Sequence, residues 1–340
     1  MDIVIHIGNH KTGSKTLQRH LFQNLKYRKF LGDPYKPGSH IEELFERIKY
    51  QDLLSYNTQR VKELFNDLKN SEIHDTKNYP VLISDESLVT PYLGGKMTAD
   101  PGLIANRIKD LFGDVKILYV IRSQITMLPS MYSQFVSPEF INQRDFEETI
   151  QLHLANQLNG MMHGLRYDKI CDYYIKLFGK KNIKVIPYEL LDHYPKLYYK
   201  EICEFINEPI DYQLIDRLSI FKENQRADSK NIAFRKYSLK YERLRKRYKL
   251  NRVSNYIPFI NGKTAKYLFN NLFFKKNKNL FIPKELENVI YEFFGVSNHR
   301  LQEMFNLDLS KFDYPLLSPN TETEKKNDKF ELNGWSLRRY

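Results

Sequence analysis

Four short apolar runs, separated by stretches with helical spacing, constrain the fold of this chain more than any other feature. The runs cover residues 3–7, 81–83, 115–121 and 183–186. Between them apolar residues recur every three or four positions, as on one face of an amphipathic helix, for example at Leu17, Leu21 and Leu25. The same spacing predicts two last helices, around 286–294 and 301–305. Short apolar strands that alternate with helices are typical of α/β proteins. The sequence therefore predicts a parallel β-sheet flanked by helices on both faces.

Three segments with polar and charged residues directly follow these predicted strands: 8–16, 84–87 and the residues from Arg122 onward. The carboxyl ends of parallel strands lie at one edge of a sheet, and ligands bind in the crevice outside that edge. We therefore expect the three segments to meet and to form the functional site.

The length and composition indicate one domain. A chain of 340 residues, 41% of them hydrophobic, can bury a full core. We expect a single domain over 1–318, with a basic helical insertion over about 229–285 and a polar tail over 319–340.

The net charge of +12 originates in part of that insertion. Residues 229–279 contain 15 Lys and Arg but a single acidic residue, Glu242. Such a segment attracts an anionic partner, such as an acidic glycan, a nucleic acid or a lipid headgroup. A solvated basic helix without a partner would have the same composition.

Metal and disulfide sites are not expected. Cys171 and Cys203 lie far apart and outside any metal-binding motif, which favours a reducing compartment. His20 and His153 occur in helical stretches without a second ligand nearby, so we expect no metal. No run approaches the length of about 18 apolar residues that spans a membrane, so the sequence predicts a cytoplasmic protein that could contact a membrane surface.

The loop after the first strand is a candidate phosphate-binding loop. A strand that passes through a glycine-containing loop into a helix presents free backbone N–H groups to a phosphate. The nucleoside-triphosphate version places Lys directly after the second glycine, but here Ser14 follows Gly13 and the lysine is at position 15. An ATP-dependent kinase therefore fits imperfectly but stays open. The candidate phosphate-binding residues are Lys11, Thr12, Gly13, Ser14, Lys15 and Thr16.

The sequence from His6 to Gln18 resembles the 5'-phosphosulfate loop of the sulfotransferase family, whose usual core is Lys-Thr-Gly-Thr-Thr. This resemblance implies a P-loop-like fold, 3'-phosphoadenylyl sulfate (PAPS) as the donor, adenosine 3',5'-bisphosphate (PAP) as the product, and no metal. It also implies that Arg122, and Ser130 eight residues later, bind the 3'-phosphate. By the same resemblance, Asn224 and Arg226 belong to a loop that closes over the nucleotide.

Two carboxylates, Asp85 and Glu86, end the second predicted strand. Three uses compete: a magnesium ligand in a kinase, a general base in a sulfotransferase, and a cap for a helix that starts near Ser87. Resemblance to glycan-modifying sulfotransferases implies Glu86 as the base, with Lys11 stabilising the leaving phosphate. A histidine is the base in other branches of the family, but the sequence indicates no histidine near Glu86, and His74 is the closest.

The resulting hypothesis is sulfuryl transfer from PAPS to a hydroxyl or amine of a carbohydrate or glycolipid. An anionic acceptor or a membrane surface would contact 229–279, and no nucleic acid is expected. The alternatives are an ATP-dependent kinase and a basic protein that binds nucleic acid or a membrane surface.

Overall fold

The computed structural model describes residues 2–32, 35, 37–70, 80–86, 88–89, 92–93, 96–97, 100–135, 146–155, 162–220 and 282–319. The strands are β1 (Ile3–Gly8), β2 (Lys29–Gly32), β3 (Val81–Ser84), β4 (Tyr92–Leu93), β5 (Lys96–Met97), β6 (Lys116–Ile121) and β7 (Ile183–Pro187). The α-helices are α1 (Ser14–Thr16), α2 (His40–Tyr50), α3 (Thr58–Leu68), α4 (Pro101–Phe112), α5 (Gln124–Phe135), α6 (Phe146–Ala155), α7 (Tyr167–Phe178), α8 (Glu189–His193), α9 (Pro195–Phe205), α10 (Tyr212–Ile220) and α13 (Lys284–Phe305). Shorter π and 3-10 segments are η1 (Leu17–Leu21), η2 (Phe22–Asn24), η5 (His163–Leu165), η6 (Lys180–Asn182) and η9 (Leu309–Phe312).

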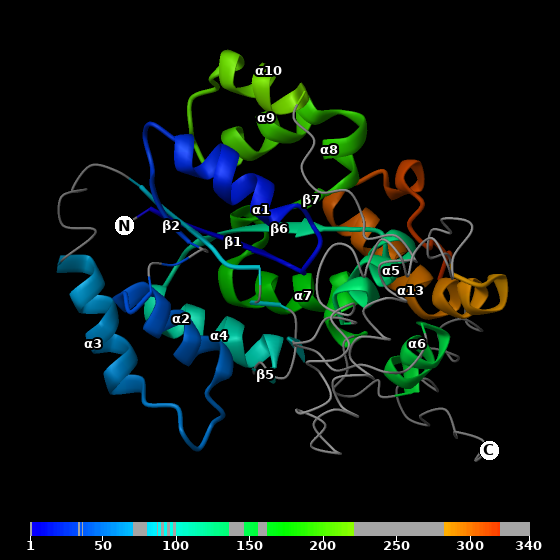
Figure 1. Ribbon diagram of the computed structural model, residues 1–340, viewed down its shortest axis with the longest axis horizontal. Helices are drawn as coiled ribbons and strands as arrows, with labels where there is room; N and C mark the ends of the chain where they lie inside the picture. Colours follow the sequence, from blue (N-terminus) through cyan, green and yellow to red (C-terminus); the bar gives the residue numbers. More distant parts are fainter. Residues whose placement is uncertain are drawn as a thin grey trace, which may run out of the picture.

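The main sheet is parallel and has the strand order β2-β3-β1-β6-β7 (Figure 1). The register pairs His6 with Ser84 across β1 and β3, and Gly8 with Val120 across β1 and β6. The carboxyl ends of these strands therefore lie at one edge. The four predicted strands and their parallel arrangement are confirmed, whereas β2 is an additional strand.

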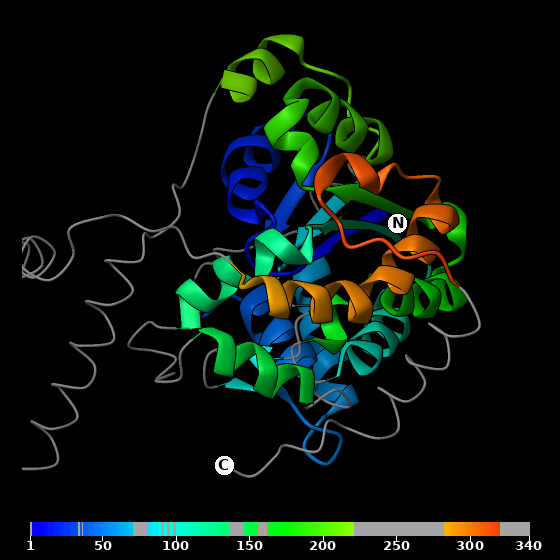
Figure 2. The same ribbon diagram turned by 90° about the vertical axis from the view of Figure 1, so that its right-hand side faces the viewer.

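Helices cover both faces of this sheet, as predicted. One face packs alternate strand residues such as Ile5, Ile83 and Ile117 into a core with α2, α3, α4, α7 and α13. The other face packs Val4 and Val120 against the segment after the loop and against α9 and α10. Figures 1 and 2 show the sheet between these two layers of helices.

Three predicted helices take different forms in the structure. The helix predicted from Leu17 to Leu25 begins at Ser14, ends at Asn24 and is a composite of α1, η1 and η2. The two C-terminal helices expected around 286–294 and 301–305 are one continuous helix, α13. Gly295 lies inside α13, where a Cβ atom would come within 2.6 Å of the side chain of Leu317. This glycine therefore allows the segment after α13 to pack against the helix.

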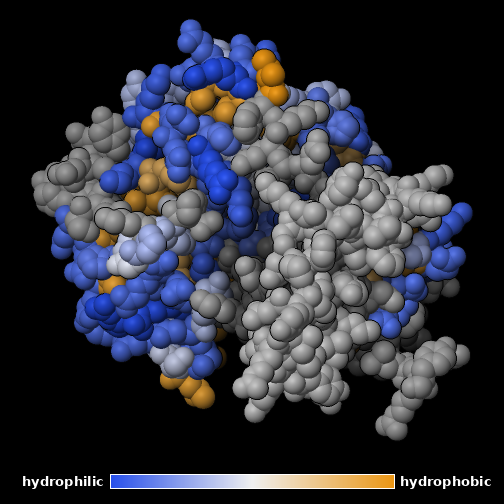
Figure 3. Space-filling view, in the orientation of Figure 1, coloured by the Kyte–Doolittle hydropathy of each residue, from blue (hydrophilic) through white to orange (hydrophobic). Residues whose placement is uncertain are grey.

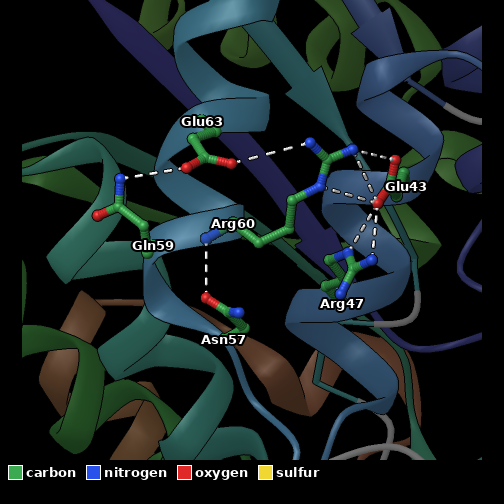
Figure 4. A network of polar contacts seen from close by, with 6 residues as sticks. All are labelled: Glu43, Arg47, Asn57, Gln59, Arg60 and Glu63. Carbon is green, nitrogen blue, oxygen red and sulfur yellow. Dashed lines mark hydrogen bonds and ion pairs between the residues drawn. The ribbon is translucent and has the colours of Figure 1, made fainter.

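A surface network joins α2 to α3 (Figure 4). Arg60 of α3 donates to both carboxylate oxygens of Glu43, and Arg47 donates to the same carboxylate from one turn along α2. These hydrogen bonds, from Arg60 first and from Arg47, lower the pKa of Glu43. The network holds the two helices side by side above their shared apolar contacts.

Several sequence-based predictions concern residues outside the described ranges. Nearly all of the basic insertion and of the polar tail falls there. Within the described ranges, no helix is long and apolar enough to cross a membrane. Cys171 and Cys203 are free and buried, as expected for cysteines that form no disulfide.

Candidate active site

The loop after β1 turns sharply at two residues with left-handed backbone conformation. Lys11 has a φ of 71° and Gly13 a φ of 76°. The Thr12 hydroxyl is buried and donates to the Asn9 carbonyl oxygen at 2.7 Å, which fixes the turn. Gly13 precedes the helical segment and has no side chain to cap its first N–H groups, so these groups can bind an anion.

Two exposed lysines, Lys11 and Lys15, lie at this loop. Ser14 and Thr16, by contrast, are buried. Figure 3 shows hydrophilic residues over the helical segment that follows the loop. The combination of uncapped N–H groups and exposed lysines suits a phosphate or a sulfate.

Arg122 connects the end of β6 to this loop. Its Nη1 donates to the carbonyl oxygen of Lys11 at 2.6 Å, and its Nε donates to the Thr126 hydroxyl at 3.0 Å. The guanidinium lies 4.9 Å from the ring centre of Tyr188, and the same ring would be 2.7 Å from a Cβ atom on Gly13. Arg122 and the phosphate-loop candidate thus form one packed unit.

Asp85, at the end of β3, forms a buried ion pair. Its Oδ2 accepts from the Lys49 ammonium at 2.6 Å and from the Tyr35 hydroxyl at 2.8 Å. This pair ties the end of β3 to α2. The same carboxylate was a candidate magnesium ligand and a candidate helix cap, but the lysine already provides a positive charge at Oδ2, and residues 88–89 are not helical.

Glu86 contacts a histidine of the loop after β1, and the sequence analysis did not predict this contact. The Nδ1 atom of His10 lies 3.0 Å from Oε1 of Glu86, and both side chains are mostly buried. Burial of Glu86 raises its pKa, but the hydrogen bond from His10 and the positive charges of His10 and Lys15 outweigh this effect, so the pKa is lowered. The interpretation that no histidine lies near Glu86 is therefore wrong, because His10 reaches it across the β1–β3 pairing.

A second buried histidine, His6, stabilises the same edge without taking part in proton exchange near neutral pH. Its Nδ1 lies 2.7 Å from the Ser84 hydroxyl, which also accepts from Gln18 at 3.1 Å. Burial lowers the pKa of His6 to about 4. A neutral imidazole at this place holds β1, β3 and the helical segment together.

The segment after α13 supports the residue that follows Arg122. The backbone N–H of Ser123 donates to the buried Glu189 carboxylate at 2.9 Å, and the Tyr314 hydroxyl donates to the same carboxylate at 3.0 Å. The Ser123 hydroxyl donates to the Asp313 carbonyl oxygen at 2.7 Å. Burial raises the pKa of Glu189 despite these bonds.

The structure brings together some of the predicted site residues. Lys11 is joined to Arg122, the Thr12 and Ser14 hydroxyls lie 3.3 Å apart, and Lys15 acts electrostatically on Glu86. Ser130 is nearly buried on α5, the helix that begins two residues after Arg122. Asn224, Arg226 and His74 lie outside the described residues. Within the described ranges, no three His, Cys, Asp or Glu side chains gather as metal ligands.

Comparison with known families identifies the family to which this chain belongs. The sulfotransferase domain matches residues 2–249, which include the loop, Glu86 and Arg122. The chain belongs to the sulfotransferase family. Sulfuryl transfer is therefore its general activity, and the kinase alternative is wrong.

The fold of this sulfotransferase is also similar to solved structures. The crystal structure of a sulfotransferase from Alicyclobacillus acidocaldarius is 14% identical with a TM-score of 0.52, and the match covers 92% of this chain and 98% of that one. Mouse sulfotransferase SULT7A1 complexed with PAP is 13% identical with a TM-score of 0.41, over 70% and 66% of the two chains. A search of curated proteins returned no match. The first comparison supports the parallel-sheet fold predicted for this sulfotransferase.

Proposed function

We propose that this sulfotransferase transfers the sulfuryl group of PAPS to a hydroxyl or amine of a carbohydrate or glycolipid. The observation that carries the proposal is the meeting of three segments at one sheet edge. The loop after β1 offers N–H groups and Lys11, the end of β6 offers Arg122 bonded to that loop, and the end of β3 offers Glu86.

The donor fits this arrangement by charge. The N–H groups from Gly13 to Thr16 would hold the 5'-phosphate, with Lys11 and Lys15 exposed beside it. Arg122 and Ser130 would bind the 3'-phosphate, which distinguishes PAPS from ATP. Arg122 is 8% exposed and bonded to Lys11, so it would have to exchange part of this contact for phosphate oxygens. Asn224 and Arg226 complete the donor site in this proposal.

Transfer proceeds by in-line displacement. The acceptor oxygen or nitrogen forms a bond to sulfur while the bond from sulfur to the 5'-phosphate oxygen breaks. Glu86 takes the proton of the acceptor, and Lys11 neutralises the charge that grows on the departing phosphate. The products are the sulfated acceptor and PAP, and this scheme requires no metal.

The acceptor is proposed from Glu86 and from the basic segment. A carboxylate base suits the weakly acidic hydroxyl or amine of a sugar. The 15 Lys and Arg of residues 229–279 would attract an anionic glycan or a glycan on a lipid, and would permit contact with a membrane surface. If neutralising Lys246, Arg247 and Lys249 together left acceptor affinity unchanged, this part of the proposal would fail.

Calorimetric titration with PAP, and separately with ATP and magnesium, tests the donor assignment. We expect the native protein to prefer PAP, and Arg122→Ala to lose that preference because the 3'-phosphate loses its guanidinium. Arg19→Ala is the matched control, because this arginine lies in η1 and not at the end of β6. Tight ATP binding without preference for PAP would refute the PAPS assignment.

A further inference from the structure

We propose that His10 is a positioning residue that keeps Glu86 ionised and turns one of its oxygens toward the acceptor. This inference rests on the proposed function, because it concerns the same base. His10 directly precedes Lys11 in the loop. One short segment therefore carries both the lysine proposed to stabilise the departing phosphate and the histidine that contacts Glu86. The base and the donor loop are thereby coupled.

The hydrogen bond between the two side chains has a defined direction. A carboxylate has no proton to give, so Nδ1 of His10 carries the proton and donates to Oε1 of Glu86 at 3.0 Å. Nε2 of His10 is buried and has no hydrogen-bond partner in the described part of the chain. The imidazole therefore faces Glu86 with its donor and is enclosed at its other nitrogen.

The two oxygens of Glu86 have different surroundings. Oε1 accepts the bond from His10, whereas Oε2 accepts no hydrogen bond from any described residue. The Glu86 side chain keeps 14% of its surface exposed, compared with 10% for His10. Oε2 is thus the atom available for an acceptor proton, and His10 acts through Glu86.

The other charged groups near Glu86 act on the charge of its carboxylate in opposite directions. Lys15, from the helical segment after the loop, favours the carboxylate, and neighbouring Asp85 disfavours it. The charge of Asp85 is offset by Lys49 from α2, and His6 on β1 is neutral near neutral pH. Without His10, the pKa-raising effect of burial on Glu86 would be opposed less strongly, and Glu86 would hold its proton more tightly. A protonated Glu86 cannot act as a base.

Two substitutions separate the hydrogen bond from the charge. His10→Asn keeps an N–H donor near the place of Nδ1, whereas His10→Leu removes donor and charge at similar size. His40→Asn is the control, because this histidine is exposed at the start of α2. The Glu86 carboxyl carbon would be followed by NMR in protein labelled at glutamate, and assigned by its loss in Glu86→Gln.

We expect the titration midpoint of Glu86 to move to higher pH in His10→Leu and to move less in His10→Asn. PAP release from PAPS, with water as the acceptor, should fall at low pH in His10→Leu and recover as the pH rises. Glu86→Gln should lose about 10²- to 10⁴-fold at every pH. PAP affinity should stay close to that of the native protein in all of these variants.

Three results would overturn the inference. An unchanged Glu86 midpoint in His10→Leu would remove the coupling. Equal loss of PAP affinity in both His10 variants would make His10 a structural part of the loop. Loss of activity in His10→Leu at every pH, with PAP bound normally, would make His10 itself the proton acceptor. Failure of the proposed function is distinguishable, because the native protein would then release no PAP while the carboxyl titration remained readable.

Discussion

Replacement of Gly13 by alanine tests how the loop after β1 packs against Tyr188. The residue has a φ of 76°, and a Cβ atom there would lie 2.7 Å and 2.9 Å from two ring carbons of Tyr188. Two separate costs therefore arise in Gly13→Ala. A left-handed backbone costs a residue with a Cβ atom about 1–2 kcal/mol, and forced overpacking costs about 1–3 kcal/mol.

Gly38→Ala is a matched control for the first cost. Gly38 has a φ of 75°, but a Cβ atom there would have no neighbour within 4 Å. The loss of freedom in the unfolded chain, worth about 0.4–1 kcal/mol, is shared by both variants and cancels in the comparison. We therefore expect Gly13→Ala to be less stable than Gly38→Ala by about 1–3 kcal/mol, the cost of displacing the Tyr188 ring.

Urea denaturation measures this difference through the midpoints, provided that the slopes of the two variants agree. Because the Tyr188 ring also lies against Arg122, Gly13→Ala should weaken PAP binding as well, whereas Gly38→Ala should not. Equal losses of stability in the two variants would refute the reasoning, since the ring contact would then contribute nothing. Normal PAP affinity in Gly13→Ala would separate Tyr188 from the donor site.

Two further predictions concern ion pairs of opposite burial. Lys49→Met leaves the buried Asp85 carboxylate without its ammonium and should lower the free energy of unfolding by about 3–5 kcal/mol. The double variant Lys49→Met, Asp85→Leu should recover most of that stability. Urea midpoints measure both variants, and equal losses of stability in the single and the double variant would contradict the pairing. Glu43→Gln in the α2–α3 network should cost less than about 1 kcal/mol, and the cost should shrink with added salt. The pKa of Glu43 is lowered in the folded protein, so its contribution is present above the pKa of the unfolded chain and disappears as the pH falls through the folded value. A Glu43→Gln effect that grew at low pH would contradict this sign.

The parts of the fold that depend on local pattern could be predicted from sequence. The run from Ile3 to Gly8 is apolar on both faces because both faces of the parallel sheet are covered. The edge strand β2 begins at Lys29 and pairs with β3 alone, so its four residues carry little apolar signal. The continuity of α13 was missed because Gly295 interrupts the apolar spacing, and only the packing of Leu317 explains that glycine.

The candidate site could be predicted in position but not in its contacts. The loop and Arg122 follow recognisable strands, which placed them at one edge. His10 and Glu86 are 76 positions apart, and their contact depends on how β1 pairs with β3. Lys49 reaches Asp85 from a helix whose pattern shows only that one side is apolar. Such contacts follow from the tertiary arrangement and leave no local signal.

The contacts of Ser123 bear on the order in which the protein can assemble. Ser123 is held by Asp313 directly and by Tyr314 through Glu189, and α5 is held at its first residue by Asn298. During synthesis the strands β1 to β7 leave the ribosome before any of these partners does. The turn that follows Arg122 therefore acquires its last supporting contacts late, after translation of more than nine-tenths of the chain. A nascent chain stalled before α13 could already bond Arg122 to Lys11 and Thr126. It would lack the bond from Ser123 to Asp313 and the bond from Tyr314 to Glu189, so the start of α5 would reach its final support only after the segment that follows α13 has been made.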